Sequence, residues 1–225
     1  MAASASALTA NFDVLAPTHI GKAGSDPLPK GASTVDVFVD AIKSAMDSAG
    51  FDRAHVAGYS LGGWVAMELA RCGRALSVDE VSLDRLRRFF KTVSLGSRVG
   101  KHGVSLAARF PSARRFLLRD TVAHGTECLP TPWFASFMRS RHLKSRALSS
   151  RMRFQRLRPY DDPGVPLTIA WPQEDRLLPF ERYGRAWQAA APFAKWETMP
   201  GVGHVPNYDE PELVARQVLA ATRPM

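Results

Sequence analysis

The chain has 225 residues, enough for one sizeable domain, and its 45% hydrophobic and 23% charged residues exclude wholesale disorder. Two cysteines, Cys72 and Cys128, form no disulfide framework or metal-ligand pattern, and no apolar run reaches the ~18 residues of a membrane span. The first ten residues lack the basic start of a signal peptide, so we expect a cytoplasmic protein.

The net charge of +9 is unevenly distributed along the chain. Residues 71–158 contain 20 Lys and Arg against 5 Asp and Glu, whereas the remainder contains 10 against 16. This difference in charge indicates that two segments of one domain, which we call the frame, are separated by a basic insertion. We therefore predict a single domain over residues 1–225, with an insertion at residues 74–160.

The first frame segment alternates between short apolar runs and helical patterns. Residues 12–16 are apolar except for one Asp and predict a buried strand, and an apolar stripe predicts a helix over 35–49. A short strand is expected at 55–57, followed by a Gly-rich turn and a helix with little polar surface at 64–70. Strand, turn and buried helix in this order predict a parallel α/β fold.

The second frame segment continues the same alternation. Residues 165–171 have the pattern of a central strand, 181–190 of a helix, and 194–199 of a further strand. A loop follows at 201–204, and an Asp-Glu-Pro sequence at 209–211 opens a last helix.

A nucleophile motif lies between the predicted strand at 55–57 and the helix that follows it. Gly58, Ser60 and Gly62 match the pattern G-x-S-x-G in the strand-to-helix context that this motif requires. The turn is strained, and glycines at the flanking positions tolerate the close backbone approach. The start of the helix, with the backbone N–H of Leu61, offers a donor to a developing oxyanion.

A serine nucleophile needs a base, and the base needs a carboxylate that orients it. Asp175 and His204 each follow a predicted strand, and the carboxyl ends of parallel strands meet at one edge of a sheet. We expect Ser60, Asp175 and His204 to converge there, with Glu174 as a rival for the acid.

These segments resemble the α/β-hydrolase superfamily, and within it the serine hydrolases that carry a lid. The resemblance covers residues 11–72 and 164–222, with matches at the elbow around Ser60, the acid loop around Asp175 and the histidine loop around His204. It implies an α/β-hydrolase-like parallel sheet with an inserted helical lid. It also implies that Ser60 is the nucleophile, Asp175 the acid, His204 the base, and Leu61 an oxyanion donor through its backbone.

The match departs from the family pattern at its N-terminal side. Thr18 occupies a position where the family usually has an acidic residue, and nothing corresponds to the family's first three strands or to the His-Gly loop with the second oxyanion donor. We expect a sheet that is incomplete on this side, as in an N-terminally truncated hydrolase. Either residues 12–16 pair in parallel with 53–57, which we favour, or the sheet ends at the elbow strand.

The basic insertion is open to three interpretations. Its basic residues can form the solvated faces of a lid, attract an anionic substrate or membrane, or bind nucleic acid. Because no recognised nucleic-acid motif accompanies them, we expect a helical lid between residues 83 and 157, with its basic residues outward, and no nucleic-acid partner.

The resemblance implies hydrolysis of a small ester-like substrate, with an anionic one as a further option, and no metal or organic cofactor. A Ser at the elbow argues against haloalkane dehalogenases and epoxide hydrolases, which share the frame but use Asp at this position. Two alternatives stay open: a catalytically impaired hydrolase-like fragment, and a basic binding protein that uses the lid surface.

Overall fold

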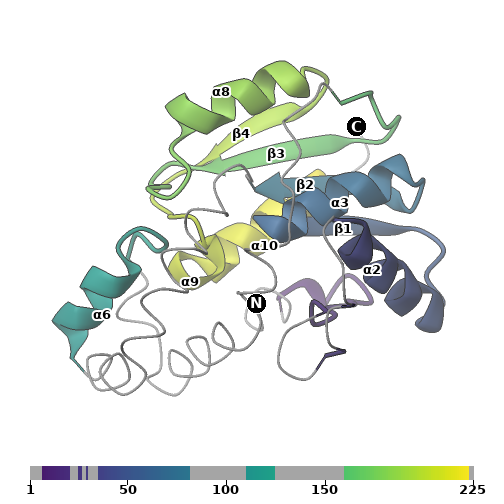
Figure 1. The fold of residues 1–225 in the computed structure, drawn as a ribbon, viewed down its shortest axis with the longest axis horizontal. Coiled ribbons are helices and arrows are strands. Elements are labelled where there is room, and N and C mark those ends of the chain that lie inside the picture. Colours follow the sequence, from purple (N-terminus) through teal and green to yellow (C-terminus); the bar gives the residue numbers. More distant parts are fainter. Residues whose placement is uncertain are drawn as a thin grey trace.

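A computed structural model describes residues 7–20, 25–26, 29, 35–81, 110–124 and 160–222 of the chain. Within these residues, parallel strands form one sheet in the order β1-β2-β3-β4, flanked by helices (Figure 1). The strands are β1 (Ala54–Tyr59), β2 (Ala75–Val81), β3 (Leu167–Pro172) and β4 (Lys195–Met199). The helices are α2 (Asp36–Ser48), α3 (Leu61–Arg71), α6 (Pro111–Leu118), α8 (Phe180–Ala190), α9 (Pro206–Asp209) and α10 (Pro211–Ala221). The predicted parallel α/β fold is confirmed.

Helices cover both faces of the sheet (Figure 1). On one face, α3 packs against β1 and β2, α2 packs against α3, and α8 shares a core cluster with β3. On the other face, α10 packs against β2 and β3. A parallel sheet is stable only when both faces are buried, and the central strands accordingly have apolar side chains on both sides.

Successive side chains of β3 point to opposite faces of the sheet and belong to two different core clusters. Ile169 and Trp171 are buried in the cluster with α3 and α8, whereas Ala170 packs with Met199 and Val202 toward α10. All six residues of β3 are buried. Burial of a side chain such as Ile169 contributes ~1.5–3 kcal/mol relative to leaving it in water.

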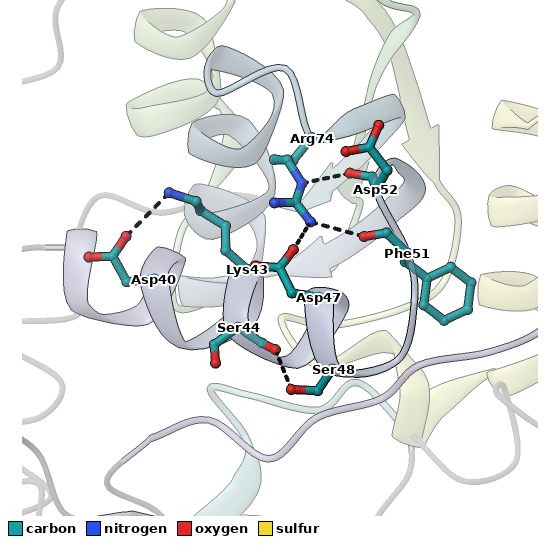
Figure 2. Close-up of polar contacts among 8 residues, drawn as sticks. All are labelled: Asp40, Lys43, Ser44, Asp47, Ser48, Phe51, Asp52 and Arg74. Carbon is teal, nitrogen blue, oxygen red and sulfur yellow. Dashed lines mark hydrogen bonds and ion pairs between the residues drawn. The ribbon is translucent and has the colours of Figure 1, made fainter.

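Arg74 joins three elements at the end of the sheet opposite the strands' carboxyl ends (Figure 2). Its guanidinium donates to the backbone oxygens of Asp52 (2.6 Å) and Phe51 (2.9 Å) and to the Asp47 carboxylate at the end of α2 (2.5 Å). The side chain is 17% exposed, so these bonds are partly shielded from water. Arg74 therefore fixes the connection from α3 to β2 against the preceding helix and loop.

The predicted start of the insertion at residue 74 is wrong. Residues 75–81 form β2, which pairs in parallel with β1 and with β3 and so belongs to the centre of the sheet. Its sequence places Ser77 and Asp79 at buried positions, and these polar residues hide the hydrophobic pattern of a central strand. The sheet therefore extends through residue 81.

The favoured pairing of residues 12–16 with the elbow strand is also wrong. This segment forms no strand, and within the described residues the sheet ends at β1. Phe12 reaches the edge of β1 through an edge-on contact with the His55 ring, at 5.9 Å between centroids. Val14 and Leu15 remain 38% and 39% exposed. Among the described helices, α10 packs against β2 and β3, so none of them gives a strand beyond β1 the second cover that parallel strands need.

Within the segment that was predicted to be a lid, the structure describes residues 110–124, which contain one helix, α6. The turn that follows α6, residues 119–124, is hydrogen-bonded to Asp209 at the end of α9. The rest of the predicted lid, residues 82–109 and 125–159, lies outside the described residues. Among the helices that the structure describes, none is both long and apolar enough to cross a membrane.

Candidate active site

The three predicted site residues follow three different strands and meet at one edge of the sheet. Ser60 lies between β1 and α3, Asp175 follows β3, and His204 follows β4. All three strands run parallel, so their carboxyl ends bring these side chains to the same place.

Ser60 occupies a strained turn. Its φ of 56° and ψ of −126° make it the one non-glycine residue with a positive φ in the described part of the chain. Such a backbone costs on the order of 1–3 kcal/mol and persists only where the surroundings enforce it. A Cβ built on Gly58 would lie 2.3 Å from the backbone oxygen of Gly62, so only glycine fits the first flanking position. The turn thus holds the Ser60 side chain away from the strand, toward His204.

His204 connects the other two side chains. Its Nε2 lies 3.2 Å from Ser60 Oγ, and its Nδ1 lies 2.9 Å from Asp175 Oδ2. With Nδ1–H donating to the carboxylate, Nε2 is free to accept the hydroxyl proton of Ser60. The side chains of His204 and Asp175 are 4% and 0% exposed, so this pair is shielded from water.

The Asp175 carboxylate is itself anchored. Its second oxygen, Oδ1, accepts a hydrogen bond of 2.7 Å from the backbone N–H of Leu178. The backbone oxygen of Leu178 accepts in turn from the Trp171 indole at 3.2 Å. Glu174, the rival for the acid, is exposed and pairs with Arg176 at 3.5 Å. Asp175 is therefore the carboxylate that faces His204.

The start of α3 supplies donors beside Ser60. Leu61 is the first residue of this helix, and the first N–H groups of a helix have no acceptor within it. Gly62 follows, and the Nε2 atom of His19 lies 3.8 Å from where a Cβ on Gly62 would be. The His19 ring therefore lies beside the start of this helix.

The turn after α6 is a neighbour of the site that sequence reasoning missed. Val205 N–H donates to the Thr121 backbone oxygen at 2.9 Å, and Arg176 donates to that of Arg119 at 3.2 Å. The carboxylate of Asp209 accepts from the backbone N–H of Gly203. The contacts of Val205 and Arg176 join positions more than 50 residues apart, and no local pattern in the sequence indicates them.

The buried groups around the site hold no arrangement suited to a metal. Within the described residues, no three His, Cys, Asp or Glu side chains are grouped as a metal site requires.

Burial raises the pKa of the Tyr59 phenol, next to Ser60, although its hydrogen bond to Asn207 opposes the rise. Tyr59 therefore stays protonated and packs with the core below the elbow.

Comparison with known proteins gives one family and several relatives. The sequence profile of the alpha/beta hydrolase family matches residues 2–217. The epoxide hydrolase EphH of Mycobacterium tuberculosis is 24% identical over an alignment of 193 positions, which covers 78% of this chain and 88% of that protein.

Solved structures of hydrolases have the same fold. A thermophilic esterase from Thermogutta terrifontis superimposes with a TM-score of 0.70 at 17% identity, over 97% of this chain and 82% of that one. The enol-lactonase from Burkholderia xenovorans LB400 superimposes with a TM-score of 0.73 at 19% identity, over 98% of this chain and 84% of that one. At these identities the likeness is one of fold.

Proposed function

The chain belongs to the alpha/beta hydrolase family, and from this premise we propose that it is a serine hydrolase that cleaves an ester-like carboxylic bond. The observation that carries the proposal is the position of His204. Its two ring nitrogens lie within hydrogen-bonding distance of Ser60 Oγ and Asp175 Oδ2. A nucleophile, a base and an orienting carboxylate in this order are the groups that acyl transfer needs.

In the proposed reaction, His204 Nε2 takes the Ser60 hydroxyl proton as Oγ attacks the carbonyl carbon. The carbonyl oxygen becomes an oxyanion, which the Leu61 N–H at the start of α3 stabilises. The protonated imidazole, held by Asp175, then gives its proton to the leaving oxygen as the carbon–oxygen bond breaks. Water repeats these steps on the acyl-serine: its proton goes to Nε2, its oxygen forms the acid, and Ser60 regains its proton.

A serine nucleophile also favours acyl substrates over epoxides, which are the substrate class in the name of EphH. A carboxylate that opens an epoxide forms an ester, which water can hydrolyse. Ser60 would instead form an alkyl ether, and neither His204 nor a bound water can cleave an ether by the same chemistry. We therefore propose carboxylic esters or lactones as the substrate class of this chain.

The proposal extends to the setting of the reaction. We propose a small-molecule substrate in the cytoplasm, and the excess of Lys and Arg in residues 71–158 favours an anionic one. A helical lid over the site, built from the insertion after β2, is part of the same proposal and is supported by α6.

A fluorophosphonate serine probe tests the function. We expect the wild-type protein to be labelled and Ser60→Ala to be unlabelled, because the probe bonds to an activated serine oxygen. His204→Ala should also lose nearly all ester turnover, on the order of 10⁶-fold in kcat, and the double variant should lose little more. Ser48→Ala is the matched control, since Ser48 is exposed on α2 and only bonds a backbone oxygen of its own helix.

The outcomes separate the proposal from its alternatives. Absence of labelling in a well-folded wild-type protein would rule out the serine hydrolase. Labelling without turnover of any ester would indicate an impaired hydrolase. Salt-sensitive binding of a generic nucleic-acid duplex by an unlabelled protein would favour the basic binding protein.

A further inference from the structure

The turn after α6, residues 119–124, lies between the two loops that carry the base and the acid (Figure 1). On the acid side, Arg176, next to Asp175, donates to the Arg119 backbone oxygen. On the base side, the backbone N–H of Val205, next to His204, donates to the backbone oxygen of Thr121. The turn thus contacts the immediate neighbour of each residue in the pair.

Asp209 is the side chain that fastens this turn to the histidine loop. Its Oδ2 accepts hydrogen bonds from the backbone N–H groups of Gly203 (2.8 Å) and Ala123 (2.9 Å). Its Oδ1 accepts from the backbone N–H of His124 at 2.6 Å. A carboxylate that accepts from several N–H groups makes charge-assisted bonds, which are stronger and shorter than neutral ones. One side chain therefore holds two segments that lie about 80 residues apart in the sequence.

Gly203 is packed tightly against the backbone of the turn after α6. A Cβ on Gly203 would lie 2.8 Å from Ala123 N and 3.0 Å from the Val122 carbonyl carbon. Gly203 and Val122 are both buried, and His204 itself is 3% exposed. Because Gly203 precedes His204 directly, a shift of this backbone displaces the imidazole.

We propose that Asp209 is a positioning residue for His204, and that the turn after α6 is a structural part of the active site. Asp209 does not touch Ser60 or the reacting atoms. It fixes the backbone from which His204 reaches Ser60 and Asp175, so it sets the distance over which the proton moves. The inference rests on the proposed role of His204 as the base.

Asp209→Asn tests the inference, because an amide cannot accept from all three N–H groups and turns its own NH₂ toward one of them. We expect the rate constant of fluorophosphonate labelling to fall about 10–100-fold, since a misplacement of about 1 Å costs on this order. For an ester substrate, kcat should fall while KM stays unchanged. Asp209→Glu keeps the charge and both acceptors and should recover part of the loss. Glu210→Gln is the matched control, since Glu210 is the exposed neighbour and carries the same charge.

The rate and the extent of labelling separate positioning from a loss of folded protein. A misplaced His204 lowers the rate constant of labelling and leaves the final amount of labelled protein unchanged. A lower fraction of folded protein reduces the final amount labelled. Should Asp209→Asn fail to fold, Asp209→Glu is measured with the same readouts, and wild-type behaviour in it contradicts the inference.

A readout without catalysis keeps the two proposals distinguishable. The Nδ1 proton of His204, shared with Asp175, should give a slowly exchanging proton resonance in the wild type and a broadened one in Asp209→Asn. If the wild type is not labelled at all, the proposed function fails, and this resonance still decides whether Asp209 positions His204. An identical resonance and an unchanged labelling rate in folded Asp209→Asn would overturn the inference.

Discussion

Gly58 and Gly62 flank Ser60 symmetrically in the motif, yet the folded chain constrains them differently. A Cβ on Gly58 would lie 2.3 Å and 2.4 Å from backbone atoms of Gly62, which cannot move away as a side chain can. At Gly62 the nearest atom to a Cβ would be His19 Nε2, at an ordinary contact distance of 3.8 Å. The motif's second glycine is therefore not required by the packing of the described residues.

Gly58→Ala should accordingly destabilise the protein by ~1–3 kcal/mol or more, as overpacking of a rigid site does. Gly62→Ala should leave the free energy of unfolding within about 1 kcal/mol of wild type, because alanine also favours the helix that begins here. Chemical denaturation of the two variants measures both values. Equal losses at the two positions would contradict the steric account of the elbow.

At the residue scale, the sequence predicts best what local pattern determines. Ser60 lies in a motif whose strand and helix are themselves recognisable, and Asp175 and His204 follow strands with clear apolar patterns. The role of Asp209 could not be predicted, because two of its three backbone donors belong to residues 85 and 86 positions away. Every residue except proline has a backbone N–H, so the residue type of the donor does not indicate which of these groups a side chain will bind.

At the element scale, Arg74 offers a test of how the sheet is held to its first helices. Arg74→Ala removes bonds to Asp47 and to two backbone oxygens, and of these acceptors the backbone oxygen of Phe51 is left part-buried without this donor (Figure 2). We expect a loss of ~1–3 kcal/mol, since hydrogen bonds to charged groups contribute more than neutral ones. Thermal and denaturant unfolding measure the change.

The same region contains a matched control for Arg74. Lys43 pairs with Asp40 on the exposed side of α2 at 3.5 Å (Figure 2). Asp40 is 73% exposed, and pairs of this kind contribute ~0–1 kcal/mol. Lys43→Ala should therefore change stability little. A comparable loss in the two variants would mean that the Arg74 bonds contribute no more than a surface ion pair.

At this scale, the sequence predicts correctly those helices and strands whose apolar side chains follow a regular helical or strand period. The helices α2, α8 and α10 and the strands β1, β3 and β4 lie where the sequence pattern placed them. β2 was missed because its buried polar residues break the pattern, and residues 12–16 were assigned to a strand on apolar content alone. Pairing depends on which helices cover the neighbouring strand, and a local window contains no information about that cover.

At the scale of the whole molecule, the sheet contains a buried acid that links stability to pH. Asp79 on β2 is 8% exposed, and its Oδ1 has no hydrogen-bond partner among the residues that the structure describes. Burial, and then the charge of Glu197 on β4, raise the pKa of Asp79 from 3.8 to about 7. Glu197 itself stays ionised, because hydrogen bonds from Lys195 and from Gln217 on α10 lower its pKa.

The folded state therefore holds a proton on Asp79 that the unfolded chain releases near its ordinary pKa of about 4. The stability that this proton confers is fully present below pH ~4 and is lost as pH rises through about 7. Asp79→Asn has no such proton to lose, so its free energy of unfolding relative to wild type should rise between these pH values, by on the order of a few kcal/mol. Denaturant unfolding at a series of pH values measures the difference, with the exposed Asp40→Asn as the control. Parallel pH curves for wild type and Asp79→Asn would show that Asp79 titrates alike in the folded and unfolded chains.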